Sequence, residues 1–154
     1  YLWDEGAPKK AFDKAINNSN KVAMSLSDLF CVERHKNQFL GLVKNELDII
    51  FANEQEILSL TDSKSFSDTI SFLKELNKNI VITRGEKGSI VINNNEVVEH
   101  PAKKNLKIKD LTGAGDLFAA GYLHGYINKL SVKECLIKGT ELSSKIIQKI
   151  GARI

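Results

Sequence analysis

The sequence predicts an α/β fold built on a largely parallel sheet with helices on both faces. Short apolar segments rich in β-branched residues alternate along the chain with longer segments in which apolar residues recur at helical spacing. Such alternation is typical of strand-helix-strand units, which form parallel sheets covered by helices. The length of 154 residues, 42% of them hydrophobic, suits one ordinary globular core. We therefore expect residues 1–154 to form a single domain.

The first half of the chain alternates helix and strand twice. Pro8 suits the first turn of a helix, and Phe12, Ala15 and Ile16 follow it at helical spacing. Two apolar segments then predict buried strands, each next to a segment with helical periodicity. The expected order after the first helix is a strand at 21–27, a helix at 33–45 and a strand at 47–53.

The second half continues the alternation and adds a hairpin. A short helix begins at Glu54, and Ser65 caps a longer one. The segment "GSIVINNNEVVEH" reads as two antiparallel strands joined by an Asn-rich turn. Ser131 and Glu134 form a capping-box pattern before the last helix. The expected elements are a strand at 79–85, the hairpin at 88–100 and helices at 115–128 and 132–150.

Composition and charge exclude several classes of protein. The 22 basic residues exceed the 19 acidic ones by three, and the lysines are scattered, which indicates a solvated surface rather than a nucleic-acid site. No apolar segment is long enough to cross a bilayer, and the first residues lack the order of a signal peptide. The spacing of cysteines and histidines indicates neither a disulfide framework nor a zinc site: Cys31, Cys135, His35, His100, His124. We expect a cytoplasmic protein without nucleic-acid or membrane partners.

The segment "TGAGD" stands where a long apolar helix begins. Gly113, Ala114 and Gly115 carry little or no side chain, so their N–H groups and the positive end of the helix dipole can approach an anion closely, and phosphate is the usual one. Asp116 then suits a general base that takes a proton from a hydroxyl. The alternative is that Asp116 only complements the helix dipole, while two later glycines let the helix pack against the sheet: Gly121, Gly125.

Asn53 and Glu56 follow a predicted buried strand at a three-residue spacing, so one helical turn aims both side chains at the same region. An amide and a carboxylate suit a hydrated magnesium ion that bridges phosphates, because Mg²⁺ keeps several waters and takes few protein ligands. A plain helix cap, with Asn53 as the N-cap and Glu56 closing a capping box, explains the same pair without function. Both interpretations stay open at this point.

The segment "VITRGEKGS" has part of a P-loop's composition but not its order. A P-loop needs Gly-Lys-Ser/Thr in sequence at the start of a helix, whereas Gly88 interrupts that order here and a strand is expected to follow. Thr83 and Arg84 end the preceding strand, where an Arg side chain can grip phosphate through two hydrogen bonds. The alternative is a tight turn with a surface arginine.

Taken together, these three motifs resemble the ribokinase-like (PfkB) family of carbohydrate and nucleoside kinases in order and spacing. They read Asn-x-x-Glu, Thr-Arg-Gly-x-x-Gly and Asp-x-x-Gly-Ala-Gly-Asp. The resemblance covers essentially the whole chain, which corresponds to the C-terminal half of a family member. It implies a three-layer α/β/α fold with a mainly parallel sheet, of which this chain is a part, and ATP-dependent transfer of the γ-phosphoryl group to a primary hydroxyl.

The resemblance also implies roles for individual residues. Asp116 would be the catalytic base, and Gly113, Ala114 and Gly115 the anion hole. Asn53 and Glu56 would organise Mg²⁺ and phosphate, with Glu56 reaching the ion through water. The remaining residues would line the nucleotide site, the last two of them from the final helix: Thr83, Arg84, Gly85, Gly88, Thr140, Ser143.

The acceptor is a small sugar or nucleoside in this interpretation. Residues 25–39, "SLSDLFCVERHKNQF", resemble the adenosine-kinase-like branch, which places a nucleoside slightly ahead of a sugar of the fructokinase or ribokinase type. Family members are about twice as long, and their N-terminal half supplies the lid and most acceptor contacts. The chain alone is then expected to need that half or a second copy as a homodimer. The rival class is a nucleotide-binding fragment without catalysis.

Overall fold

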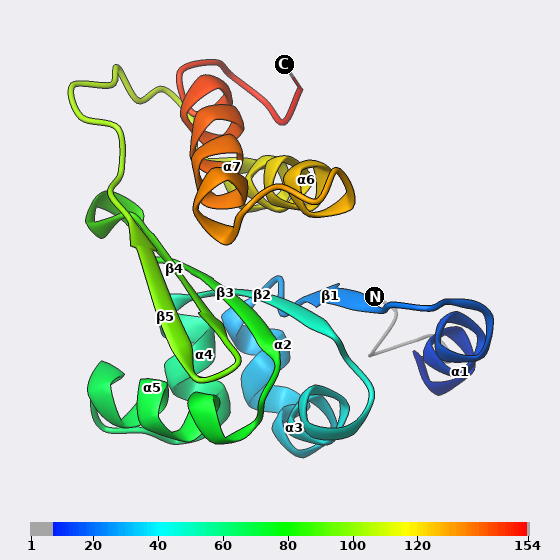
Figure 1. Cartoon of the computed structure of the whole chain (residues 1–154). Helices are drawn as coiled ribbons and strands as arrows, with labels where there is room; N and C mark the ends of the chain where they lie inside the picture. The colour runs from blue at the N-terminus through cyan, green and yellow to red at the C-terminus, as the bar shows by residue number, and fades with distance from the viewer. Residues whose placement is uncertain (1–7, 154) are drawn as a thin grey trace. The chain divides into compact units, whose positions relative to one another are not determined.

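The computed structural model describes residues 8–153 (Figure 1) and confirms the predicted α/β class. Its helices are α1 (Pro8–Asn18), α2 (Leu29–Arg34), α3 (Lys36–Asn45), α4 (Glu54–Thr61), α5 (Phe66–Glu75), α6 (Ala114–Ile127) and α7 (Val132–Ile146). The strands are β1 (Ala23–Ser25), β2 (Ile49–Asn53), β3 (Asn79–Thr83), β4 (Ser89–Asn93) and β5 (Glu96–His100), with a 3₁₀ turn at Gly85–Lys87. Within residues 8–153, no helix has the length and apolar character needed to cross a membrane.

The strands form one mixed sheet in the order β1-β2-β3-β4-β5. β1 and β2 are parallel, with Ala23 opposite Ile49. The connections from β3 to β4 and from β4 to β5 are too short for a parallel crossover, so β4 runs antiparallel to both of these neighbours. Asn94 and Asn95 form the turn between β4 and β5, and both have positive φ (47° and 69°), as a two-residue hairpin turn requires. The predicted hairpin is therefore confirmed.

Two compact units divide the chain. The first comprises Tyr1–Ile80 and Ile92–Asn95, and the second comprises Val81–Val91 and Glu96–Ile154. The motif Asn53-x-x-Glu56 lies in the first unit, whereas the turn after β3 and the glycine-rich turn before α6 lie in the second. The expectation of a single domain stays a prediction.

In the first unit, β2 forms the centre of the core. Its apolar positions Ile49 to Ala52 are all buried, as a strand packed on both faces requires. The neighbouring helices contribute further buried side chains: Val32, Phe39, Val43, Ile57, Leu60, Leu73. This packing holds the carboxyl end of β2, where Asn53 lies, in a fixed place.

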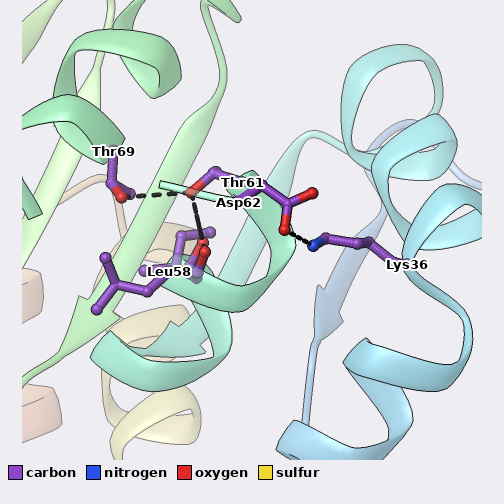
Figure 2. Close-up of polar contacts among 6 residues, drawn as sticks. Lys36, Leu58, Thr61, Asp62 and Thr69 are labelled. Carbon is purple, nitrogen blue, oxygen red and sulfur yellow. Dashed lines mark hydrogen bonds and ion pairs between the residues drawn. The ribbon is translucent and has the colours of Figure 1, made fainter. Parts of the chain in front are cut away.

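Polar contacts fix the end of α4, as Figure 2 shows. Asp62 caps this helix in the left-handed conformation (φ 52°) and forms an ion pair with Lys36 of α3. The Thr61 hydroxyl lies 2.9 Å from the Ile57 carbonyl and 3.3 Å from the Thr69 hydroxyl of α5. α4 is thus linked by polar contacts to α3 and to α5.

In the second unit, α6 packs directly against α7. A Cβ added to Gly121 would lie 2.5 Å from the Lys138 carbonyl oxygen, and one added to Gly125 would lie 2.9 Å from the Cys135 sulfur. Glycine is therefore needed where the two helices approach. The expectation that these glycines serve packing against the sheet was wrong about the partner, because a close helix neighbour is not visible in the sequence pattern of α6 alone.

The predicted helix at 33–45 is wrong at its start and in its continuity. Asp28 caps a helix that already begins at Leu29, since its side chain accepts a hydrogen bond from the Cys31 N–H at 3.2 Å. His35 then leaves helical geometry (φ −116°, ψ 25°) and separates α2 from α3. The apolar spacing continues through the break, which is why periodicity alone did not show it. The predicted strand at 21–27 is likewise reduced to Ala23–Ser25.

The last helix ends at Ile146, four residues before the predicted end. Another helical turn would join the Gly151 N–H to the Ile147 carbonyl. Instead, that carbonyl accepts from the N–H groups of Lys109 (2.8 Å) and Asp110 (3.3 Å). The Gly151 N–H donates to the Asp110 carboxylate at 2.8 Å. Both groups of the missing helical bond are therefore taken by the segment that leads into the glycine-rich turn.

Candidate functional site

The start of α6 differs from an ordinary helix start because its cap is a glycine. Gly113 is the N-cap, with φ 77° and ψ 2°, and no side chain makes a capping hydrogen bond there. This left-handed conformation favours glycine. A Cβ at Gly113 would also lie 2.9 Å from the Ala152 Cβ, so two independent constraints require glycine at this position.

The first turn of α6 is exposed at Gly115 and Asp116. The Ala114 N–H donates to the Leu111 carbonyl at 3.1 Å, so in this conformation it is already engaged. The N–H groups of Gly115 and Asp116 belong to the first helical turn, which lacks intrahelical acceptors. Gly115 is exposed, and nothing lies within 4 Å of the position that its Cβ would occupy. Asp116, also exposed, adds a carboxylate to the same turn.

Asp110 joins the glycine-rich turn to the end of the chain. One carboxylate oxygen accepts from the Thr112 N–H at 2.9 Å and from the Thr112 hydroxyl at 2.7 Å. The other accepts from the Gly151 N–H at 2.8 Å. The Thr112 amide, followed by the Gly151 amide, holds the pKa of Asp110 below its usual range. The carboxylate is therefore charged at neutral pH.

Asn53 and Glu56 form a complete capping box at the start of α4. The Asn53 side chain accepts from the Glu56 N–H at 2.8 Å, and the Glu56 carboxylate accepts from the Asn53 N–H at 2.9 Å. The Asn53 side-chain amide also donates to Glu56 at 2.7 Å. Glu56 is 5% exposed. The pKa of Glu56 is raised above its ordinary value, and burial is the main cause. The hydrogen bond from the Asn53 N–H lowers this pKa, whereas the negative charge of Asp28 raises it further.

The fit of this pair to magnesium is limited to a hydrated ion. Among residues 8–153, no three His, Cys, Asp or Glu side chains come together as a metal-binding group. Each Glu56 oxygen already accepts a hydrogen bond but retains a lone pair for a water molecule. Mg²⁺ usually keeps several waters and is held mainly by substrate phosphates. The donor set therefore fits Mg²⁺ only through water.

The turn after β3 is a 3₁₀ turn closed by hydrogen bonds between its own residues. The Arg84 N–H donates to the Gly88 carbonyl at 2.8 Å. Gly85 and Gly88 both have positive φ, 56° and 93°. A Cβ on Gly88 would lie 2.1 Å from the His100 carbonyl oxygen, so the close approach to the end of β5 demands glycine. β4 follows directly, as the sequence predicts.

Thr140 and Ser143 lie in α7, in the same unit as the glycine-rich turn. Thr140 is 7% exposed, whereas Ser143 is partly exposed. Gly139, next to Thr140, packs against Phe118 of α6: an added Cβ would lie 2.9 Å from the Phe118 carbonyl oxygen. A role for these two residues at a nucleotide stays a prediction.

Sequence reasoning gave Asp110 no role of its own. It belongs to the motif Asp-x-x-Gly-Ala-Gly-Asp, so its spacing from the glycines was visible. Its partner Gly151 lies 41 residues further along the chain, and no local pattern predicts such a contact. The available signal was the ending "KIGAR", whose glycine is typical of a residue after a helix end.

These features define an α/β chain in which one long helix begins at a glycine cap beside an exposed carboxylate. Residues 8–154 match the family described as pfkB family carbohydrate kinase. A cytidine kinase of Thermococcus kodakarensis is 34% identical over 119 residues, which cover 75% of this chain and 42% of that protein. The chain belongs to the pfkB carbohydrate kinase family.

Solved structures agree with this membership and with the ribokinase-like fold. An adenosine kinase from Sinorhizobium meliloti superposes with a TM-score of 0.94 at 38% identity, covering 100% of this chain and 49% of that one. A probable sugar kinase from Rhizobium etli gives a TM-score of 0.92 at 35% identity, covering 99% of this chain and 48% of that one. The chain thus spans about half the length of the relatives it matches.

Proposed function

We propose that the chain is the nucleotide-binding and catalytic half of a kinase that transfers the γ-phosphoryl group of ATP to a primary hydroxyl. The observation that supports this most is the start of α6, where a glycine cap leaves a side-chain-free approach to the first helical turn and Asp116 stands in that turn. Family membership supports the same activity.

The chemistry needs a proton acceptor and a site for the charge of the transferred group. In the proposed reaction, the Asp116 carboxylate takes the proton of the acceptor hydroxyl while the hydroxyl oxygen forms a bond to the γ-phosphorus. The bond from this phosphorus to the bridging oxygen of ADP breaks. The N–H groups of Gly115 and Asp116 stabilise negative charge on the phosphoryl oxygens, aided by the helix dipole. Positioning and electrostatics of this kind provide most of the catalysis in phosphoryl transfer.

Magnesium would neutralise charge on the ATP phosphates when bound. In the proposal, Glu56 orients one of its water ligands, and Asn53 holds the Glu56 carboxylate in place through the two hydrogen bonds it donates. Thr83, Arg84, Gly85 and Gly88 shape the nucleotide side, with Arg84 facing phosphate.

A nucleoside is the acceptor that the similar proteins favour slightly. Among the similar proteins are the cytidine kinase, a nucleoside kinase of Methanocaldococcus jannaschii and the adenosine kinase structure. The probable sugar kinase of Rhizobium etli supports the second candidate, a sugar as acceptor. The acceptor contacts are proposed to come from a part of the protein outside this chain or from a second copy.

The test is ADP release from MgATP, measured with adenosine, cytidine, ribose and a panel of hexoses. The wild-type chain is compared with Asp116→Asn, and the melting temperature is recorded with and without MgATP. Acceptor-dependent release that the variant lacks would establish the kinase and identify its acceptor.

Two other outcomes separate the alternatives. A magnesium-dependent rise in melting temperature without turnover would identify a nucleotide-binding fragment that needs its other half. The absence of both turnover and MgATP binding would contradict the proposed function, leaving only the fold.

A further inference from the structure

We propose that Asp110 is a positioning residue that couples two turns of the second unit. The glycine-rich turn comprises residues 110–116, and the C-terminal turn comprises residues 147–152. In this proposal, the C-terminal turn supports the glycine-rich turn through Asp110. This support sets the direction in which the N–H groups of Gly115 and Asp116 point. The link to phosphate rests on the proposed function, whereas the coupling of the two turns does not.

The Asp110 carboxylate makes the central link. Its two oxygens serve different partners, one accepting from Thr112 within the glycine-rich turn and the other from Gly151 in the C-terminal turn. A carboxylate is the side chain that can accept from all three donors at once. An asparagine in its place has only one acceptor oxygen, so either the Thr112 N–H or the Gly151 N–H would face an NH₂ group.

The backbone supplies a second link at the same place. The Ile147 carbonyl, one residue past the end of α7, accepts from Lys109 and Asp110, so the segment that enters the glycine-rich turn is bonded to the C-terminal turn. The Ile147 carbonyl and the Gly151 N–H would bond to each other only if α7 continued as far as Gly151. Both instead bond to residues 109–110, which links the two turns through the backbone as well.

Side-chain packing supplies a third link. Gly113, the cap of α6, lies so close to Ala152 that an added Cβ would be 3.1 Å from the Ala152 Cα. The cap residue thus rests directly on the C-terminal turn. Contacts before the cap (Asp110 with Gly151) and at the cap (Gly113 with Ala152) fix the peptide planes that precede Gly115.

The test uses ¹⁵N-labelled chain without ligand and follows the amide resonances of Gly113, Gly115, Asp116 and Gly151. The variant is Asp110→Asn. The matched control is Glu134→Gln, because Glu134 lies in the same unit and its carboxylate also accepts from one backbone N–H and one hydroxyl, both of Ser131. A dispersed spectrum for the rest of the chain verifies that each variant is folded.

We expect Asp110→Asn to move all four resonances and to accelerate hydrogen exchange of the Gly151 amide about tenfold, the change that one charge-assisted hydrogen bond supplies. Glu134→Gln should leave them in place. Shifts confined to the immediate neighbours of residue 110, with Gly115, Asp116 and Gly151 unchanged, would overturn the proposal.

A second variant tests the same coupling by removing the C-terminal turn while leaving Asp110 unchanged. Deletion of residues 149–154 removes Gly151 and Ala152 but leaves all of α7. The deletion should move the resonances of Gly113, Gly115 and Asp116, and adding Asp110→Asn to it should move Gly115 and Asp116 little further, because the two changes break the same link. Additive shifts, or none on deletion, would contradict the coupling.

MgATP affinity separates this inference from the proposed function. If wild-type chain binds MgATP, Asp110→Asn should weaken the affinity about tenfold, and an unchanged affinity would overturn the positioning role while the function stands. If wild-type chain does not bind MgATP although the resonances move as expected, the proposed function fails and the coupling of the two turns is established.

Discussion

The starts of α4 and α6 are two solutions to the same physical problem. Every helix start leaves several N–H groups without intrahelical acceptors. At α4, the side chains of Asn53 and Glu56 satisfy these groups reciprocally, and Glu56 is buried in the process. At α6, Gly113 offers no side chain, and the exposed Gly115 and Asp116 follow. The first start is capped by its own side chains, whereas the second has no side-chain cap.

The second unit contains both solutions, which makes the contrast testable. α7 begins with the closed capping box of Ser131 and Glu134, and α6 begins with the open glycine cap. Substitutions at the closed starts should therefore change stability, whereas substitutions at the open start should change ligand binding or activity. The predictions below are ordered from the largest expected effect to the smallest.

Asp116→Asn should have the largest effect on activity. If Asp116 is the base, ADP release should fall by about 10² to 10⁴-fold, the usual contribution of a positioned base, while MgATP affinity changes little. Asp68→Asn is the matched control, since Asp68 is also an acid in a first helical turn but at a helix capped by Ser65. Equal losses in both variants would mean that Asp116 only complements the helix dipole.

Gly113→Ala should affect both binding and stability. The left-handed φ and the approach to Ala152 each oppose a side chain, and backbone strain of this kind costs about 1–3 kcal/mol. For stability, Gly151→Ala separates the two causes, because Gly151 has φ 84° but open space around its Cβ position. Urea denaturation should show a larger loss of stability for Gly113→Ala, and equal losses would rule out the Ala152 contact as a cause. MgATP titration of Gly113→Ala checks the expected loss of affinity.

Gly121→Ala should lower stability without reaching the open helix start. The added Cβ would meet the Lys138 backbone carbonyl, and overpacking typically costs about 1–3 kcal/mol. Gly41→Ala in α3 is the control, since nothing lies within 4 Å of its Cβ position, and this change should be neutral or stabilising. If thermal unfolding shows the same change in stability for both variants, the close contact of α6 with α7 does not require glycine at position 121.

Ser131→Ala should have a purely structural effect. Losing the side-chain cap of α7 costs about 1 kcal/mol, and MgATP affinity should be unchanged because this helix start is closed. Denaturation and titration of the same sample check both statements. If the binding free energy for MgATP falls by more than the free energy of unfolding does, the distinction between closed and open helix starts is wrong.

The smallest expected effect concerns acid pH. The Thr112 amide is the main cause that holds the pKa of Asp110 below the ordinary value of 3.8, so its stabilising contribution is present above 3.8 and is lost as pH falls through the lower, folded-state pKa. Asp110→Asn should therefore be less stable than wild type at pH 6, and the gap should narrow near pH 3. A gap that stays constant across this range would show that the charge of Asp110 is not what stabilises the turn.

Local sequence patterns predicted the elements that depend on local physics. The caps Ser65, Ser131 and the Asn53–Glu56 pair were visible because capping residues act within three positions. The Asn-rich hairpin was visible because two residues with positive φ suit asparagine. The glycine cap of α6 was visible as a motif.

Contacts distant in sequence were not predictable in this way. The partner of Gly121 is on another helix, and the partner of Asp110 is 41 residues away. The end of α7 was also misplaced, and the residues just after it bond to a distant segment: the Ile147 carbonyl accepts from the Lys109 and Asp110 amides. His35 interrupts a helix whose apolar spacing continues on both sides. In the candidate site, the glycine-rich turn was predicted from the sequence. Its contacts with the C-terminal turn, through Asp110 and Gly113, could be found only in the structure.

The most direct test of the central claim is a MgATP titration of ¹⁵N-labelled chain. The claim is that the α6 start binds the nucleotide's phosphates and the α7 start does not. It predicts saturable, magnesium-dependent shifts of the Gly115 and Asp116 amide resonances, with those of Val132 and Glu134 unchanged. Saturating MgATP that leaves Gly115 and Asp116 unmoved, or that moves both helix starts alike, would contradict it.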